Sequence, residues 1–207
     1  MGAPGSVVMP MFPLGTVLFP HALLPLHVFE ERYRRMTQRV LRGDGEFGVV
    51  LIERGSEVGG GDARFGVGTV ARVVRAQELP DGGYALATVG MRRIRVSRWL
   101  PDDPYPQAEV TDIAEVPSEA DEPRRARAVA AFEAVCELHR RIDPRLPEFP
   151  PIDPTPARAS FELAALAPIG PLDAQRVLEV AGTGDRLELL AGLLDDHARM
   201  LRAGGGD

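Results

Sequence analysis

The sequence offers few side chains that could form or break a covalent bond. All 24 basic residues are arginine, and the chain contains no lysine. Phosphate-binding P-loops and amine nucleophiles both require lysine, so we exclude those mechanisms. None of the five serines lies in a G-x-S-x-G turn, which makes a hydrolase the least favoured class of protein.

Cys136 and His139 are the best candidates for nucleophilic or metal chemistry, because they lie three residues apart in a stretch with helical periodicity. Zinc generally takes three or four protein ligands with recognisable spacing, and the remaining histidines, His21, His27 and His197, show none. We therefore interpret Cys136 as a small core residue and His139 as a helix-surface or packing residue. The sequence predicts no catalytic residue, no metal ligand and no cofactor.

Composition favours a globular protein of one large or two small domains. The chain has 207 residues, of which 44% are hydrophobic and 26% charged, with a net charge of −6. This acidic balance argues against a general nucleic-acid binder. A single cysteine, the absence of a secretion signal and the absence of a long apolar segment predict a cytoplasmic protein without a membrane partner. The arginine-, alanine- and glycine-rich composition is typical of a GC-rich bacterial genome.

Periodicity divides the chain into a β-rich domain over residues 7–116 and a helical domain over residues 120–203. In the first, we expect one short helix after Glu30, a glycine-rich loop over 55–66, and strands over 7–11, 24–29, 47–53, 67–78, 84–89 and 92–100. Arg93, Arg95 and Ser97 are expected on a solvated strand face. In the second, helices are expected from Pro123, over 156–166 and 172–181, and from Thr183 or Asp185, with a proline-rich connector over 142–156.

The segment FPLGTVLFPHALLPLHVFEERY, from Phe12 to Tyr33, closely resembles the opening signature of the Lon protease N-terminal domain family. Similar features follow in the same order, including V-G-T-V-A-R from Val67 and the helical pattern around Gln175 and Arg186. The resemblance covers nearly the full chain. The residues that match the opening motif are Pro13, Leu14, Pro20, Pro25, Leu26, Phe29, Glu30, Arg32 and Tyr33.

This resemblance implies an α+β protein in which a PUA-like, mostly antiparallel β-barrel domain is followed by a C-terminal α-helical bundle. It further implies a stand-alone relative that lacks the ATPase and protease domains. Such a protein is expected to be a non-catalytic protein- or peptide-binding module, an adaptor or holdase that takes unfolded or extended polypeptide as its partner. A homo-oligomer is compatible with the sequence.

Four prolines between Pro10 and Pro25 alternate with apolar residues and indicate a stiff, extended segment. We expect most of these apolar side chains to fill the barrel core and a minority to line a groove for peptide. The candidate peptide-binding residues are Phe12, Leu14, Phe19, Leu23, Phe29, Tyr33 and Phe65. The alternative is an RNA-binding PUA-like domain whose contact surface would be Arg92, Arg93, Arg95 and Arg98.

Overall fold

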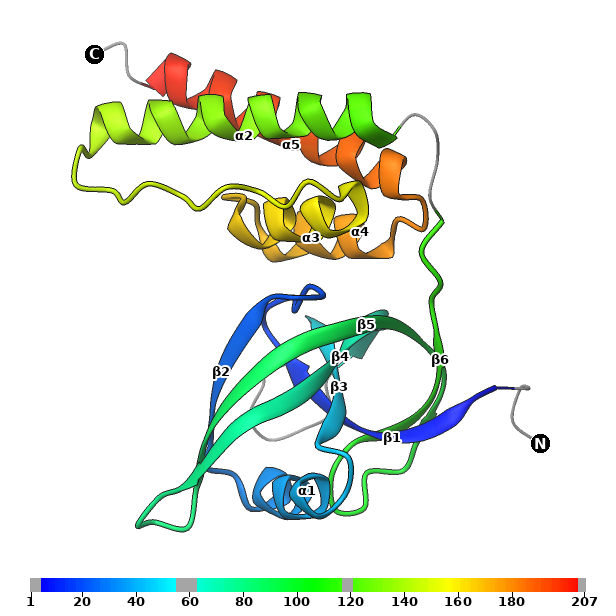
Figure 1. The fold of residues 1–207 in the computed structure, drawn as a ribbon. Coiled ribbons are helices and arrows are strands. Elements are labelled where there is room, and N and C mark those ends of the chain that lie inside the picture. Colours follow the sequence, from blue (N-terminus) through cyan, green and yellow to red (C-terminus); the bar gives the residue numbers. More distant parts are fainter. Residues whose placement is uncertain (1–4, 55–62, 117–120, 205–207) are drawn as a thin grey trace. The chain divides into compact units, whose positions relative to one another are not determined.

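A computed structural model describes residues 5–54, 63–116 and 121–204 of the chain. These residues form two compact units, Met1–Ala114 and Glu115–Asp207. The first is a β unit with one helix, and the second is a helical unit (Figure 1). The expected α+β fold, with a C-terminal helical region after a β domain, is confirmed. No helix within the described ranges is long and apolar enough to cross a membrane.

The described residues of the β unit form six strands and the helix α1, which lies between the second and third strands. Proline and glycine separate these elements, as the sequence predicts. Their bounds are β1 (Val7–Leu14), β2 (Leu23–Val28), α1 (Glu31–Arg42), β3 (Glu46–Arg54), β4 (Ala63–Glu78), β5 (Tyr84–Leu100) and β6 (Gln107–Asp112). The predicted glycine-rich loop lies largely outside the described residues.

The sheet closes on itself through its longest strand. Its order is β2-β5-β4-β3-β1-β6, and β5 also pairs with β6, so that five strands form a ring and β2 is attached to its outside edge. All pairs are antiparallel except β1 with β3. Among the described residues, β2 pairs only with the first half of β5, from Tyr84 to Val89. It is therefore an edge strand, which tolerates Pro25 because an edge need not use every N–H.

A bulge in β5 corrects one prediction about its arginines. The register between β4 and β5 shifts between Ala71–Gly90 and Thr69–Arg93. Strict alternation is broken there, and both Arg93 and Ile94 are buried, at 1% and 0% exposure. The prediction that Arg93 shares a solvated face with Arg95 is wrong, because an extra residue in a strand re-aims the side chains that follow it.

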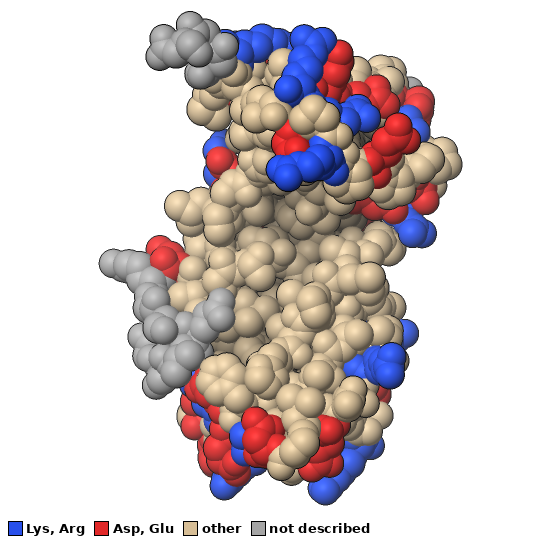
Figure 2. Space-filling model, turned by 90° about the vertical axis from the view of Figure 1, so that its left-hand side faces the viewer, with Lys and Arg blue, Asp and Glu red and all other residues tan. Residues whose placement is uncertain are grey.

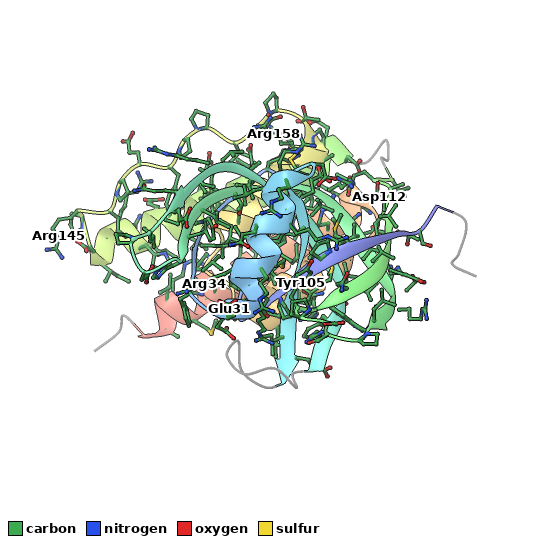
Figure 3. All side chains as sticks on the ribbon, turned by 90° about the horizontal axis from the view of Figure 1, so that it is seen from below. Glu31, Arg34, Tyr105, Asp112, Arg145 and Arg158 are labelled. Atoms are coloured by element: carbon green, nitrogen blue, oxygen red, sulfur yellow. The ribbon has the colours of Figure 1, made fainter. Side chains whose placement is uncertain are left out.

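Helix α1 covers one end of the barrel, as the view from below shows, with Arg34 on one side of the helix and Tyr105 on the other (Figure 3). Tyr33, Met36 and Val40 point inward and join a cluster of buried residues with Phe12 and Phe47. A second cluster fills the rest of the barrel and consists of Met9, Met11, Val50, Val70, Ile94, Ala108 and Val110. Helical periodicity predicts that Tyr33, Met36, Val40 and Leu41 share one inward stripe. Leu41 is instead 41% exposed, and Thr37 is buried in its place.

Within its described residues, the helical unit contains four helices, α2 (Asp121–Ile142), α3 (Pro156–Leu166), α4 (Pro171–Glu179) and α5 (Thr183–Gly204). Helical periodicity predicts a buried stripe on α5 of Leu187, Leu190, Leu194, His197 and Leu201, and the first three are fully buried. On α2, periodicity predicts a stripe of Ala126, Val129, Phe132, Cys136, His139 and Ile142. This prediction is partly wrong: Ala126 and Ile142 are exposed, whereas Ala128, Ala131 and Val135 are buried. Alanine is common on both faces of α2, so its apolar periodicity is weak.

Candidate functional site

The candidate site lies where β2 leads into α1. Along β2, side chains alternate between the two faces of the sheet. Leu24 and Leu26 pack against the core cluster, whereas Leu23, Pro25 and His27 face outward and are exposed. Phe29 follows the strand and is 51% exposed, although it is a large aromatic residue. Its ring lies 6.0 Å from that of His27. This arrangement leaves a row of uncharged, mainly apolar side chains on an edge strand.

A hollow of about 190 Å³ lies beside this row of side chains. Its floor includes Phe12 and Tyr33, whose rings are stacked with centroids 4.1 Å apart. The guanidinium of Arg32 lies over the Tyr33 ring at 4.5 Å, and Arg32 Nε donates to Glu30 Oε2 at 3.1 Å. The floor of the hollow is thus aromatic, and the two charged residues at its rim, Glu30 and Arg32, are paired with each other. The hollow is lined by Phe12, Leu14, Pro25, Leu26, His27, Val28, Phe29, Glu30 and Tyr33.

The structure divides the predicted peptide-binding residues into core and surface. Phe12, Leu14, Phe19 and Tyr33 are buried, with exposures of 7%, 6%, 3% and 3%. Leu23 is 75% exposed and Phe29 is 51% exposed, while Phe65 is partly buried. Of this set, the hollow brings together Phe12, Leu14, Phe29 and Tyr33, and its lining does not include Phe19, Leu23 or Phe65. Of the motif prolines, Pro13 and Pro20 are buried and Pro25 is exposed.

Backbone contacts hold the motif segment in place. Gly90 N donates to the Ala22 carbonyl at 2.9 Å, and His21 N donates to the Gly90 carbonyl at 2.7 Å. A Cβ at Gly90 would lie 2.1 Å from the Phe19 carbonyl oxygen, so only glycine permits this approach. Thr88 Oγ1 also donates to the Leu24 carbonyl at 2.7 Å. The candidate site is therefore built on a rigid support.

The surface around β2 is largely uncharged. On the neighbouring strand, the residues opposite Leu23, Pro25 and His27 are Val89, Ala87 and Ala85. Figure 2 shows this side of the β unit, where charged residues gather toward the end that carries α1 and leave a broad uncharged area beyond it. An uncharged area of this kind is unusual for an exposed edge strand, which is commonly protected by charge.

The arginine cluster considered for RNA is not a free basic surface. Arg92 pairs with Glu46 at 2.8 Å and with Asp112 at 3.0 Å. Arg98 pairs with Glu109, and its pKa is raised by that hydrogen bond. Arg93 is buried. Phosphate contacts would have to displace these acidic partners, so the geometry disfavours the RNA alternative.

In the helical unit, the side chains that could take part in catalysis have structural roles. Ser160 Oγ donates to the Ala157 carbonyl at 2.6 Å and accepts from Arg186 Nε at 2.8 Å. Burial raises the pKa of the Cys136 thiol, which keeps it protonated and unreactive. Among the described residues, no group of three or more His, Cys, Asp or Glu side chains could hold a metal ion.

Two arrangements in the helical unit were missed from the sequence. Arg186 is fully buried and donates from Nη2 to Glu115 Oε2 at 2.6 Å and from Nη1 to the Val180 carbonyl at 3.0 Å. His139 and His197 face each other with their Nε2 atoms 3.4 Å apart. The meeting of the two histidines depends on how α2 packs against α5, which the pattern of either helix alone does not show.

Comparisons with known proteins agree with this fold and motif. Residues 8–196 match the family described as the ATP-dependent protease La (LON) substrate-binding domain. Lon protease of Xanthomonas oryzae is 30% identical over 200 residues, which are 93% of this chain and 23% of that protein. Lon protease of Escherichia coli is 29% identical over 202 residues, 95% of this chain and 26% of that protein. The chain thus spans about a quarter of the length of these curated relatives.

Two solved structures share the architecture. A Lon N-terminal domain protein from Xanthomonas campestris is 26% identical, with a TM-score of 0.64, and covers 90% of this chain and 98% of that one. The N-terminal domain of Mycobacterium avium complex Lon protease is 17% identical, with a TM-score of 0.65 over 92% of this chain and all of that domain, and it supports the fold alone. The family match, together with the motif around β2 and α1, establishes that this chain belongs to the LON substrate-binding domain family.

Proposed function

We propose that this protein is a non-catalytic recognition module that binds unfolded or extended polypeptide through the β2 edge of its β unit. The family is named for substrate binding. The observation that carries the proposal is the exposed Phe29, which stands beside an aromatic-floored hollow at the end of an uncharged edge strand. An adaptor or holdase role in the cytoplasm follows from this proposal.

Side-chain contacts, more than strand addition, are expected to supply the affinity. Pro25 has no N–H to donate, so a peptide could not form an uninterrupted ladder along β2. Leu23 and Phe29 instead offer apolar surface to side chains of a bound segment. The support beneath them is already ordered, which lowers the entropic cost of binding. A short site of this kind resembles weak, transient interfaces, and we expect micromolar dissociation constants, about 8 kcal/mol in magnitude.

The test is a titration of a labelled, reduced and unfolded polypeptide with the full chain. Phe29→Ser and Leu23→Ser should each weaken binding about tenfold, a change of about 1.4 kcal/mol, without changing the thermal unfolding transition. Matched controls are Leu172→Ser and Met200→Ser, because both residues are apolar, 64% exposed and in the helical unit. These two variants should bind as the unchanged chain does.

Salt concentration separates the proposal from the RNA alternative. The charges at the rim, Glu30 and Arg32, are paired with each other, so binding of polypeptide should change little between low and moderate salt. Equal affinity for all four variants would contradict the β2 site. Steeply salt-dependent binding of RNA, lost on substitution of Arg95 or Arg98, would favour the alternative.

A further inference from the structure

Two histidines from different helices meet in the helical unit. His139 lies on α2 and His197 on α5, 58 residues apart in sequence, with Nε2 atoms 3.4 Å apart and ring centroids 5.2 Å apart. Both side chains are partly buried. Buried neighbours on the same helices, such as Val135 and Leu194, fix the backbone on either side. The two ring nitrogens are therefore held near one another by the packing of the unit.

The two Nε2 atoms lie at the long end of hydrogen-bond distance, with the donor set by the tautomer, and the same separation also suits a shared metal ion. A tetrahedral zinc ion bonds to histidine nitrogen at about 2.0–2.1 Å, which places two such ligands about 3.3–3.4 Å apart. The observed distance of 3.4 Å matches this spacing.

The nearby acidic residues of α5 have other partners: Asp195 pairs with Arg127 at 3.3 Å, and Asp196 pairs with Arg199. Both of these carboxylates are therefore engaged by arginines rather than by the two imidazoles.

We propose that His139 and His197 bind one transition-metal ion of the Zn²⁺ class through their Nε2 atoms. The two remaining tetrahedral positions are left to water or to an oxygen donor supplied from outside the chain. With two protein ligands, the site is weak and exchangeable, unlike a closed structural zinc site. A bound ion links α2 to α5 and stabilises the helical unit against unfolding. The pair was treated from sequence as two unrelated packing residues.

The experiment is a calorimetric titration of Zn²⁺ alone into the full chain without a histidine tag. We expect one ion per chain, and His139→Gln and His197→Gln should each lower the affinity at least tenfold. The matched control is His21→Asn, because His21 is exposed in the β unit at φ 69°, a conformation that asparagine also tolerates. This variant should bind zinc as the unchanged chain does.

Two further measurements distinguish loss of zinc binding from loss of folding and test whether Cys136 is a ligand. Thermal unfolding with chelator present should be similar for all four proteins, whereas added Zn²⁺ should raise the transition only in the unchanged chain and His21→Asn. The Co²⁺ complex should lack a thiolate charge-transfer band, because Cys136 is not a ligand. Equal zinc affinity in the glutamine variants, or no binding at about 1 mM Zn²⁺, would overturn the proposal.

Discussion

The β unit joins segments that are distant in sequence through backbone contacts, whereas the helical unit joins them through side chains. In the first, Val7 pairs with Val110, and Gly90 lies directly against the Phe19 carbonyl. In the second, Arg186 reaches Glu115, and His139 meets His197. The stability of the closed β-sheet depends on close packing of backbone and apolar side chains. The stability of the helical unit depends on contacts between particular polar side chains. The two units should therefore differ in which substitutions they tolerate.

The largest effect is expected from removing volume in the β unit. Phe47 is 1% exposed and lies 6.2 Å from the Phe12 ring. Phe47→Ala should lower the free energy of unfolding by about 3–5 kcal/mol, because a cavity remains where the ring was. Urea unfolding followed by fluorescence reports this unit, since Trp99 on β5 is the only tryptophan. Val74→Ala, at a residue 59% exposed, should change stability by less than about 0.5 kcal/mol.

A somewhat smaller effect is expected from removing a single cation in the helical unit. Arg186→Met removes the hydrogen bonds that this guanidinium donates to Glu115, Ser160 and the Val180 carbonyl. The loss should be about 2–4 kcal/mol, because Glu115 is partly exposed and can regain water. Far-ultraviolet circular dichroism during urea unfolding measures it. The control is Arg176→Met, whose exposed pair with Asp173 should contribute less than about 1 kcal/mol. If Arg186→Met and Arg176→Met lower the free energy of unfolding equally, the helical unit does not depend on particular buried polar groups, and the contrast between the units fails.

Adding one carbon in the β unit tests its dependence on close backbone approach. A Cβ at Gly90 meets backbone atoms of Phe19, whereas a Cβ at Gly66 meets nothing within 4 Å. Gly90→Ala should therefore destabilise the β unit by about 1–3 kcal/mol. Gly66→Ala should be nearly neutral. If Gly90→Ala leaves tryptophan-detected unfolding unchanged, the backbone at Phe19 can move away at little cost.

The smallest effect concerns pH and the helical unit. The pKa of His197 is lowered from its ordinary value of 6.5, first by burial and then by His139. The unfolded chain therefore binds this proton more readily than the folded protein, and the free energy of unfolding should fall as the pH drops below 6.5. Urea unfolding at several pH values should show a shallower fall in His197→Gln than in the unchanged chain. A parallel fall in both would assign the acid sensitivity to other groups.

Much of the fold could be predicted from the sequence, because periodicity and proline or glycine breaks determine where most elements begin and end. The failures have local causes. Arg93 is buried because a bulge re-aims β5, and single-residue insertions leave no signal in a strand pattern. Thr37 replaces Leu41 in the core because the packing of α1 against the barrel selects a slightly rotated face.

The candidate site was predicted less completely than the fold. Its motif was recognisable, but the sequence did not show which of its apolar residues are exposed. Phe29 and Leu23 are exposed, whereas Phe12 and Phe19 are buried, although all four lie in one short segment. Their alternation depends on where β2 begins and how it pairs with β5. The meeting of His139 with His197 depends on the packing of two helices, which neither helix specifies alone.

The pairing of β1 with β6 also sets an order of events during protein synthesis. Val7 and Val8 pair with Val110 and Glu109, so this end of β1 must wait for roughly a hundred residues before β6 leaves the ribosome. Until then the barrel cannot close, and the part of β1 from Val7 to Pro10 lacks the strand with which it pairs, whereas the part from Met11 to Leu14 can already pair with β3. A chaperone that acts on the nascent chain should therefore associate with this first segment and depart once β6 has emerged.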